Sequence, residues 1–286
     1  MSQINNTPED ILSDLRKIGF RPSKAKGQHF LKDSNIARQI IKAAGITSNT
    51  NVLEIGPGTG ALTRHLINCA GSITAVEIDP VLAKLLQESY ITYDNLTILN
   101  SDVLSLNLSE VMNASEDCRF VLVANLPYGI TGPVLGQMIK NHGRMERAVV
   151  MLQSEVGSRL TATPGTKEYG AITSIIGYYY ALESLFHVDS GRFAPRPAVK
   201  SVVLRLTPHA SPPVNVRDVN LLINLIKAAF QQRRKMLHHA VNRLNPGCAS
   251  DISEYTGINL NRRGETLDLV EFSALANALW EYKRKN

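Results

Sequence analysis

Residues 52–61 read VLEIGPGTGA, an apolar run followed by glycines at positions 56, 58 and 60. A short apolar run rich in branched side chains is typical of a strand buried on both faces of a sheet. Glycines directly after a strand let the chain turn sharply into a helix, and they let a ligand approach bare backbone. The stretch therefore predicts a buried strand that ends in a ligand-binding loop.

Similar apolar runs recur along the following hundred residues, and helical patterns fill most of the gaps between them. The runs cover residues 73–78, 96–99, 120–124 and 148–152. In one gap Asp79 stands as an N-cap before Pro80, and the pattern predicts a helix over residues 80–86. Regular alternation of strands and helices predicts βαβ units and a Rossmann-like α/β fold with a parallel sheet.

Two further runs, at residues 184–188 and 199–206, follow a helical pattern at residues 171–181. Only about a dozen residues, including Pro195 and Pro197, separate these two runs. A parallel connection needs a crossover of a dozen or more residues, usually a helix, so the two runs are predicted to be antiparallel. We therefore expect a seven-stranded sheet whose last strand is antiparallel.

A proline-rich break at residues 207–213 indicates a domain boundary. We predict an α/β domain over residues 1–207, in which residues 1–21 form an N-terminal extension. Residues 208–286 are predicted to form a small all-α domain, with helical patterns at residues 219–229, 233–244 and 269–280.

The charge of the chain is concentrated in two places. The formal charge is +6 on 286 residues and the pI is about 9.2. Residues 16–42 carry +7 and residues 208–286 carry +4, so the remainder is acidic. Two basic clusters beside an acidic body indicate an enzyme that binds a polyanion; a solubilising surface is the alternative.

Cellular location is indicated by what the sequence lacks. Its three cysteines are far apart, and neither a long apolar run nor a secretory signal is present. We expect a cytoplasmic protein with no disulfide framework, metal site or membrane span.

The glycine loop and two acids that follow later strands indicate a nucleoside ligand. Gly56, Gly58 and Ala61 match the G-x-G-x-x-G/A pattern, and Glu77 follows 21 positions after Gly56. A carboxylate at that distance suits ribose hydroxyls, so S-adenosylmethionine and NAD fit equally well, and a glycine turn without a ligand stays open. Asp102 follows the third run and suits either an adenine amino group or a helix N-cap.

Residues 125–128, which read NLPY after the fourth run, separate the two ligands. This tetrapeptide resembles the signature of the adenine-N6 methyltransferases, and specifically of the ribosomal RNA adenine dimethylase family. Further segments resemble the same family over nearly the whole chain: GQHFL at 27–31, FAPRPAVKS at 193–201, FQQRRKML at 230–237 and RGETL at 263–267. NAD becomes a remote alternative, because a proline–tyrosine turn supplies no hydride-acceptor site.

The chemistry of an adenine amine explains why these residue types are needed. Its lone pair is delocalised into the ring, so it is a poor nucleophile. The Asn125 side-chain oxygen and the Leu126 carbonyl would accept hydrogen bonds from its two N–H groups. This would direct the lone pair of the amine at the methyl group. Pro127 fixes the backbone. Tyr128 would stack on the base and stabilise developing positive charge.

The family resemblance implies further site residues, each of which has a structural alternative. Phe193 would be the second aromatic ring against a flipped adenine, or else an ordinary core residue. The cofactor S-adenosylmethionine would be bound, with no metal, by Gln28, His29, Leu31, Gly56, Gly58, Glu77, Ile78, Asp102, Val103 and Asn125. The RNA would be bound by Lys24, Lys26, Arg196, Arg233, Arg234, Lys235 and Arg263.

The resemblance implies N6,N6-dimethylation of two adjacent adenosines near the 3′ end of small-subunit rRNA, within a pre-assembled 30S subunit. We expect a monomer, since nothing in the sequence demands more. One alternative is a large-subunit rRNA adenine methyltransferase that confers antibiotic resistance. Another is a ribosome-assembly or transcription factor that keeps the fold without catalysis.

Overall fold

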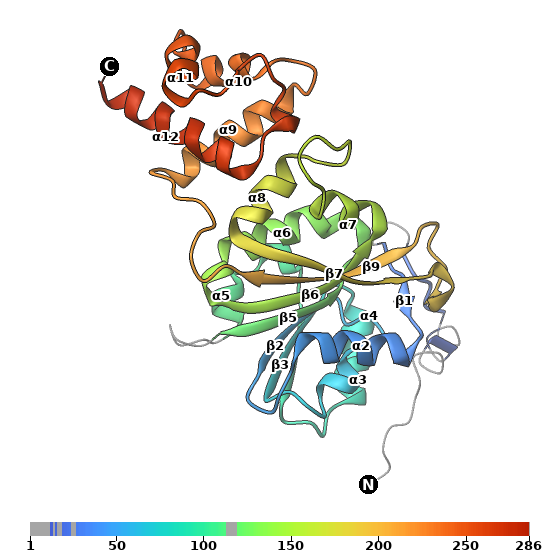
Figure 1. Cartoon of the computed structure of the whole chain (residues 1–286). Coiled ribbons are helices and arrows are strands. Elements are labelled where there is room, and N and C mark those ends of the chain that lie inside the picture. Colours follow the sequence, from blue (N-terminus) through green and yellow to red (C-terminus); the bar gives the residue numbers. More distant parts are fainter. Residues whose placement is uncertain (1–11, 14, 16–18, 24–26, 113–118, 286) are drawn as a thin grey trace. The chain divides into compact units, whose positions relative to one another are not determined.

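A seven-stranded sheet forms the centre of the computed structural model, which describes residues 12, 13, 15, 19–23, 27–112 and 119–285. The strand order is β4-β3-β2-β5-β6-β9-β7, and all of these strands except β4 are labelled in Figure 1. The strands are β2 (Asn51–Ile55), β3 (Ser72–Glu77), β4 (Leu96–Asn100), β5 (Phe120–Asn125), β6 (Met145–Gln153), β7 (Tyr180–Val188) and β9 (Ser201–Pro208). All five predicted runs from residue 52 to residue 152 are therefore strands, and they pair in parallel.

The end of the sheet also agrees with the prediction. Strand β9 lies between β6 and β7 and runs antiparallel to β6, with Val150 opposite Leu204. The backbone N–H of His209, just after β9, donates to the Tyr179 carbonyl just before β7 at 3.0 Å. This contact joins the end of one strand to the start of the other, as antiparallel neighbours require.

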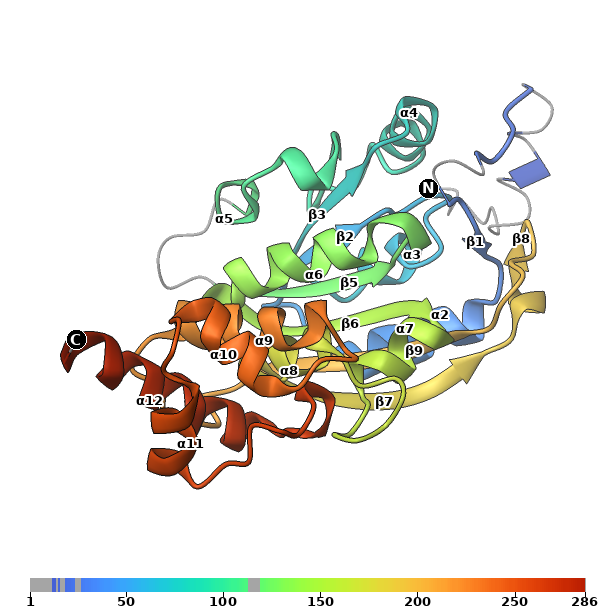
Figure 2. The ribbon, with the colours of Figure 1, turned by 90° about the horizontal axis from the view of Figure 1, so that it is seen from above.

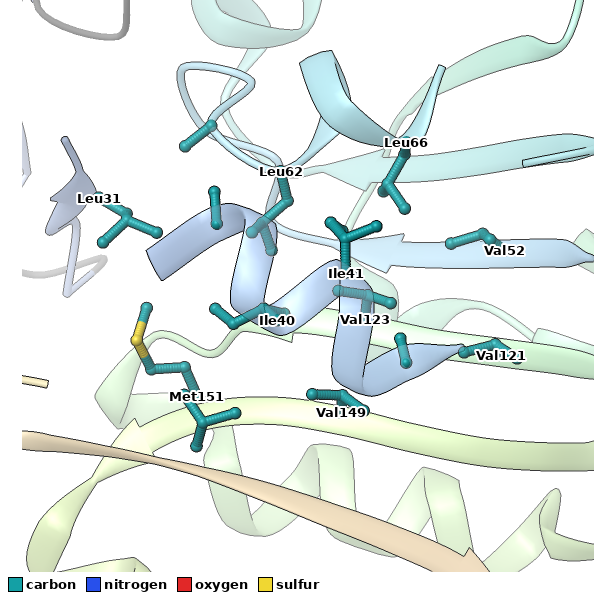
Figure 3. Packing of buried hydrophobic residues seen from close by; sticks show 14 of the residues in the cluster. Leu31, Ile40, Ile41, Val52, Leu62, Leu66, Val121, Val123, Val149 and Met151 are labelled. Atoms are coloured by element: carbon teal, nitrogen blue, oxygen red, sulfur yellow. The ribbon is translucent and has the colours of Figure 1, made fainter. Parts of the chain in front are cut away.

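Helices cover both faces of the sheet. On one face α2 (Ser34–Ala44) and α3 (Thr63–Leu66) bury Ile40, Ile41 and Leu66 against the strands, as Figure 3 shows. On the other face lies α6 (Thr131–Lys140) (Figures 1 and 2). Further helices are α4 (Pro80–Ser89), α5 (Leu108–Val111) and α7 (Ser154–Leu160). Asp79 caps α4 by accepting from the Val81 N–H at 3.1 Å, as predicted.

A second, two-stranded sheet was not predicted from the sequence. It pairs β1 (Phe30–Leu31) with β8 (Phe193–Ala194) in antiparallel register, and the two strands lie side by side in Figure 2. Strands of two residues are too short to show a period of two. The pairing joins the two family-like segments at residues 27–31 and 193–201.

The described part of the N-terminal extension packs against this region. Leu12 and Leu15 are buried in a cluster with Phe30 and Leu82. The extension has an amphipathic pattern in its sequence, formed by Ile11, Leu12, Leu15 and Ile18, and the two leucines are used for packing within the same compact unit. Ile11 and Ile18, which complete the pattern, lie outside the described residues.

The chain divides into two compact units. The first contains residues 1–157 and 183–208, and the second contains residues 158–182 and 209–286. The predicted boundary at 207/208 lies within one residue of the last division, whereas residues 158–182 belong to the second unit rather than to the α/β domain. That segment contains α8 (Ala171–Tyr179). In the sequence α8 lies between two strands, as a helix of a βαβ unit would, so the sequence does not indicate that it belongs to the second unit.

The second unit is helical in its C-terminal part. It contains α9 (Val219–Gln231), α10 (Leu237–Leu244), α11 (Ala249–Thr256) and α12 (Leu269–Lys285). Helix α11 was not predicted, and α10 begins at Leu237 instead of residue 233 because a turn occupies residues 232–234. Phe230 packs on Phe272 with ring centroids 6.2 Å apart, and Leu225 and Leu275 are fully buried in the unit.

Candidate functional site

A cavity of about 310 Å³ opens at the carboxyl ends of the parallel strands in the first unit. Ligands of open α/β sheets bind at this edge because the strand-to-helix loops converge there. All ten predicted cofactor-binding residues line it: Gln28, His29, Leu31, Gly56, Gly58, Glu77, Ile78, Asp102, Val103 and Asn125. Leu126 and Pro127 line it as well. Residues from five separate segments of the sequence thus meet in one place.

The glycine loop needs glycine for two different reasons. Gly56 and Gly58 have φ of 65° and 59°, in the left-handed region that L side chains rarely adopt. In addition, a Cβ at Gly58 would lie 2.9 Å from the Phe30 ring. The loop therefore passes directly beneath β1 with no room for a side chain, and its backbone forms one wall of the cavity.

Glu77, at the end of β3, is held rigidly by backbone groups. Its Oε2 accepts from the Gly58 N–H at 3.0 Å, and its Oε1 accepts from the Asp79 N–H at 2.9 Å. The side chain is buried and lines the cavity. A carboxylate can accept about four hydrogen bonds, so capacity remains for ligand hydroxyl groups. Glu77 therefore links the glycine loop to the position where a ribose is predicted.

Asp102 forms the N-cap that was one of the two roles the sequence left open. Its Oδ1 accepts from the Leu104 N–H at 2.9 Å, which caps the short 3₁₀ turn η1 (Val103–Ser105). The exposed carboxylate also lines the cavity, while Val103 is buried beneath it. The cap fixes one oxygen, and its contact with an adenine amino group stays a prediction.

The amide of Asn125, at the end of β5, has a defined orientation. Its Nδ2 donates to the His29 carbonyl at 3.1 Å, which turns Oδ1 away from that carbonyl. The Leu126 N–H donates to the Met151 carbonyl at 2.9 Å and anchors the turn to β6. Pro127 precedes the 3₁₀ turn η2 (Tyr128–Ile130), and its carbonyl accepts from the Ile130 N–H at 3.2 Å. The side chain of Tyr128 lies outside the described residues.

The segment around residues 27–31 is tied to the cavity walls by polar contacts. Gln28 donates from Nε2 to Asp79 Oδ2 at 3.3 Å, and its Oε1 accepts from the Ser23 N–H at 2.7 Å. His29 donates from Nδ1 to the Pro195 carbonyl at 2.8 Å. The histidine side chain thus joins the β1 segment to the 193–201 segment, while its backbone carbonyl orients Asn125.

Glu54 is a cavity residue that the sequence analysis did not single out. It lies on β2, is 1% exposed, and its Oε2 accepts from the Thr63 hydroxyl at 2.8 Å. Burial, reinforced by the negative charge of Glu77, raises the pKa of Glu54 to about 8. An acid inside an otherwise apolar parallel strand was the signal available in the sequence, because such strands are normally apolar throughout.

Phe193 takes a different place from the one predicted. Its side chain is 3% exposed, belongs to the hydrophobic core and is not among the residues that line the cavity. Strand pairing sets it opposite Leu31. In this arrangement Phe193 has the core role that was its structural alternative, and a stacking role would require the ring to become exposed beside the cavity.

The predicted RNA-binding residues are divided between the two units. In the second unit Arg233 forms an ion pair with Glu265 at 2.8 Å and donates to the Lys167 and Tyr169 carbonyls. Arg234, Lys235 and Arg263 are exposed. In the first unit Arg196 donates to the Ser190 hydroxyl at 2.9 Å. Lys24 and Lys26 lie outside the described residues.

Two features are absent from the described part of the chain. It contains no group of three or more His, Cys, Asp or Glu side chains placed to hold a metal ion. It also contains no helix long and apolar enough to cross a membrane.

A mostly parallel seven-stranded sheet with an antiparallel β9, together with a glycine loop and acids at the strand ends, defines a class I methyltransferase fold. Solved structures agree with this class. A dimethyladenosine transferase from Plasmodium falciparum has a TM-score of 0.75 and 26% identity, covering 90% of this chain and 98% of that one. The 23S rRNA methyltransferase ErmE has a TM-score of 0.67 and 25% identity, covering 87% and 99%.

Sequence comparison identifies the family. The ribosomal RNA adenine dimethylase family matches residues 19–279. Ribosomal RNA small subunit methyltransferase A of Geobacillus thermodenitrificans (strain NG80-2) is 41% identical over 281 residues, covering 96% of each chain. The protein of the same name from Bacillus cereus (strain B4264) is 40% identical over 286 residues, covering 97% of this chain and 98% of its own. This chain belongs to the ribosomal RNA adenine dimethylase family.

Proposed function

We propose that this protein transfers methyl groups from S-adenosylmethionine to adenine N6 and dimethylates two adjacent adenosines near the 3′ end of small-subunit (16S) rRNA. The names of two relatives, each about 40% identical over nearly the whole length, support the small-subunit substrate. The likeness to a dimethyladenosine transferase supports the addition of two methyl groups. The activity would serve ribosome biogenesis.

The orientation of the Asn125 amide is the observation that carries this proposal. Because Nδ2 donates to the His29 carbonyl, Oδ1 is left as the acceptor for a substrate amine. The Leu126 carbonyl follows directly in the chain and supplies the second acceptor. Two acceptors would hold the adenine amine with its lone pair directed into the cavity. In favourable cases, positioning of this kind lowers the reaction barrier by roughly several kcal/mol.

The residues of the cavity fit S-adenosylmethionine. The Phe30 ring leaves no room for a Cβ at Gly58, so the loop offers bare backbone to a ligand, and buried Glu77 keeps capacity for ribose hydroxyls. Glu77 would hold the ribose, Asp102 the adenine amino group, and Gln28, His29 and Leu31 would close the site. When bound, the cofactor supplies a methyl group on a positively charged sulfur.

The substrate adenine would enter from the side of Pro127 and Tyr128. An adenine within structured RNA must first be flipped out of its stack, which costs a few kcal/mol. Pro127 stiffens the turn, and the Tyr128 ring would stack on the flipped base. No strong base is needed, because the amine loses its proton readily after it has been methylated.

We propose that the α/β region, residues 1–207, holds cofactor and adenine, while residues 208–286 add RNA contacts. The exposed cations Arg234, Lys235 and Arg263 would bind phosphates without reading sequence. The partner would be rRNA within a pre-assembled 30S subunit. We further propose that the protein acts as a monomer in the cytoplasm.

Labelled S-adenosylmethionine, purified protein and 30S subunits that lack the modification provide the test. The proposal expects label on two adjacent adenosines near the 3′ end of 16S rRNA, mapped by primer extension. Label on large-subunit rRNA instead would favour the antibiotic-resistance alternative. Absence of label on either RNA, with subunit binding retained, would favour a non-catalytic assembly factor and contradict the proposal.

A further inference from the structure

The side chain of His29 joins two segments that are far apart in the sequence. Its Nδ1 donates to the Pro195 carbonyl at 2.8 Å, across a separation of 166 residues. A carbonyl oxygen only accepts hydrogen bonds, so Nδ1 is a protonated ring nitrogen. His29 precedes β1 and Pro195 follows β8, and these two strands pair with Phe30 opposite Ala194. The ring therefore extends the connection between the strands one residue beyond the paired backbone.

The backbone groups of His29 face away from β8. In an antiparallel pair, residues that hydrogen-bond to the partner strand alternate with residues whose backbone groups face the other way. Lys32 belongs to the first kind, because its N–H donates to the Arg192 carbonyl at 2.9 Å. His29, three residues earlier, belongs to the second kind. On that side its carbonyl accepts from Asn125 Nδ2 at 3.1 Å.

The Asn125 amide needs a neighbouring group to fix its orientation. Rotation of its terminal torsion angle by 180° exchanges Oδ1 and Nδ2. The exchanged amide would present N–H donors to the substrate amine, which needs an acceptor. The His29 carbonyl accepts hydrogen bonds and cannot donate one, so it selects the orientation in which Nδ2 faces it and Oδ1 is left for the amine.

The ring contact restrains the carbonyl that makes this selection. The backbone of His29 leads directly into β1 on one side, and its ring is bonded to the segment after β8. Because the peptide group is planar, the direction of the carbonyl follows from the backbone torsion angles of His29. Without the ring contact these angles are less restricted, and the carbonyl can turn away from Asn125.

We propose that His29 is a positioning residue for methyl transfer: its ring, bound to the Pro195 carbonyl, keeps its own backbone carbonyl where it orients the Asn125 amide. The inference rests on the proposed function. In this role the imidazole acts through Asn125 and touches no reacting atom. A misplacement of about 1 Å at a reacting centre can cost about a hundredfold in rate. Loss of the ring contact should therefore slow methyl transfer more than it weakens binding of cofactor or 30S subunits.

Three substitutions of His29 distinguish the two ring nitrogens. Asparagine has its amide nitrogen where the imidazole has Nδ1, glutamine has it near the position of Nε2, and leucine has no donor. At saturating S-adenosylmethionine and 30S subunits, single-turnover rates should fall about tenfold or more in His29→Leu and His29→Gln, and stay within about threefold of native in His29→Asn. His187→Leu, at an exposed position on β7, is the matched control and should keep the native rate.

Three outcomes of these measurements would overturn the inference. Equal rates for His29→Asn and His29→Leu would show that the Nδ1 contact does not affect the reaction. Rescue by His29→Gln and not by His29→Asn would assign the effect to Nε2. A native rate for His29→Leu at saturation, combined with weaker cofactor binding in calorimetry, would show that the imidazole acts on the cofactor and not through Asn125.

The side-chain amide of Asn125 gives a readout that does not depend on catalysis. Its signal in ¹H–¹⁵N spectra of the full chain is assigned by its absence from Asn125→Ala. We expect this signal to shift in His29→Leu, because the bond to the His29 carbonyl is weakened, and to keep its native position in His29→Asn. An unmoved signal in His29→Leu would overturn the inference. If the native protein does not methylate 30S subunits, the proposed function fails, whereas this signal still decides whether His29 orients the amide.

Discussion

The cavity of the first unit and the basic residues of the second unit illustrate two kinds of sequence signal. In the cavity, all ten residues predicted to bind the cofactor line a single site. In the second unit, the run at residues 233–235 divides: Arg233 is engaged with Glu265 and two backbone carbonyls, whereas Arg234 and Lys235 are exposed. The cavity motifs predicted which side chains lie together, whereas the basic run predicted only that positive charge is present.

The difference has a physical origin. Residues after parallel strands are brought together by the sheet itself, since the carboxyl ends of the strands share one edge. Gly58 is further constrained by its φ of 59° and by the Phe30 ring. A guanidinium on an exposed turn has no such constraint, and its role depends on which acid or carbonyl lies within reach. The positions of residues that the backbone constrains can therefore be predicted from a sequence motif more reliably than the roles of clustered charges.

The largest effect is expected from Asn125→Ala, which removes the side-chain acceptor in the cavity. Turnover on 30S subunits should fall at least about a hundredfold, as is usual when a group that stabilises the transition state is lost. Cofactor affinity, measured by calorimetry, should change much less. Asn107→Ala, at an exposed position outside the cavity, is the matched control and should keep native turnover. Near-native turnover by Asn125→Ala would contradict the acceptor role.

The next effect is expected from Gly58→Ala. The new Cβ would combine a left-handed backbone with a 2.9 Å approach to Phe30, at a total cost of about 3 kcal/mol. We expect a lower melting temperature and weaker cofactor binding. Gly129→Ala also lies at the cavity, but its Cβ would meet nothing within 4 Å and its φ is not positive, so it should be nearly neutral. Equal behaviour of the two variants would show that the loop backbone has room to move.

The same contrast explains how much could be predicted from the sequence. Five parallel strands, the antiparallel β9 and the cap of α4 by Asp79 were predictable, because period and capping residues are local signals. The β1–β8 pairing was not, since it depends on two short segments more than 160 residues apart. The sequence left two places open for Phe193, beside the adenine or in the core, because a family motif says which residue is present and not which side its ring faces; the structure places the ring in the core.

A third prediction concerns Glu54 and the stability of the cofactor-free protein. Its pKa is raised from 4.5 to about 8 on folding, so between these values the unfolded chain ionises while the folded one keeps its proton. Stability must then fall as pH rises through this window, by at most about 1.4 kcal/mol per pH unit. Glu54→Gln lacks this penalty. Chemical denaturation should show the variant gaining on the native protein from pH 5 to pH 7; a constant difference would contradict the raised pKa.

The smaller effects come from the two adjacent arginines of the second unit. Arg233→Ala removes a partly exposed ion pair and two contacts to carbonyls, and we expect a loss of about 1 kcal/mol in stability. Arg234→Ala should leave the melting temperature unchanged, because within the described residues that side chain is exposed and has no hydrogen bond or ion pair. An equal drop in melting temperature for the two variants would contradict the different roles assigned to the two arginines.

In binding to 30S subunits we expect the opposite order, with a larger effect of Arg234→Ala than of Arg233→Ala. If Arg234 neutralises an RNA phosphate, its removal releases one counterion fewer on binding, and the slope of log affinity against log salt should become shallower by about one. Arg233, already neutralised by Glu265, should leave the slope nearly unchanged. The comparison uses two neighbouring residues of the same type, so it separates charge that serves the fold from charge that serves RNA. An unaltered slope for Arg234→Ala would assign this arginine to solubility.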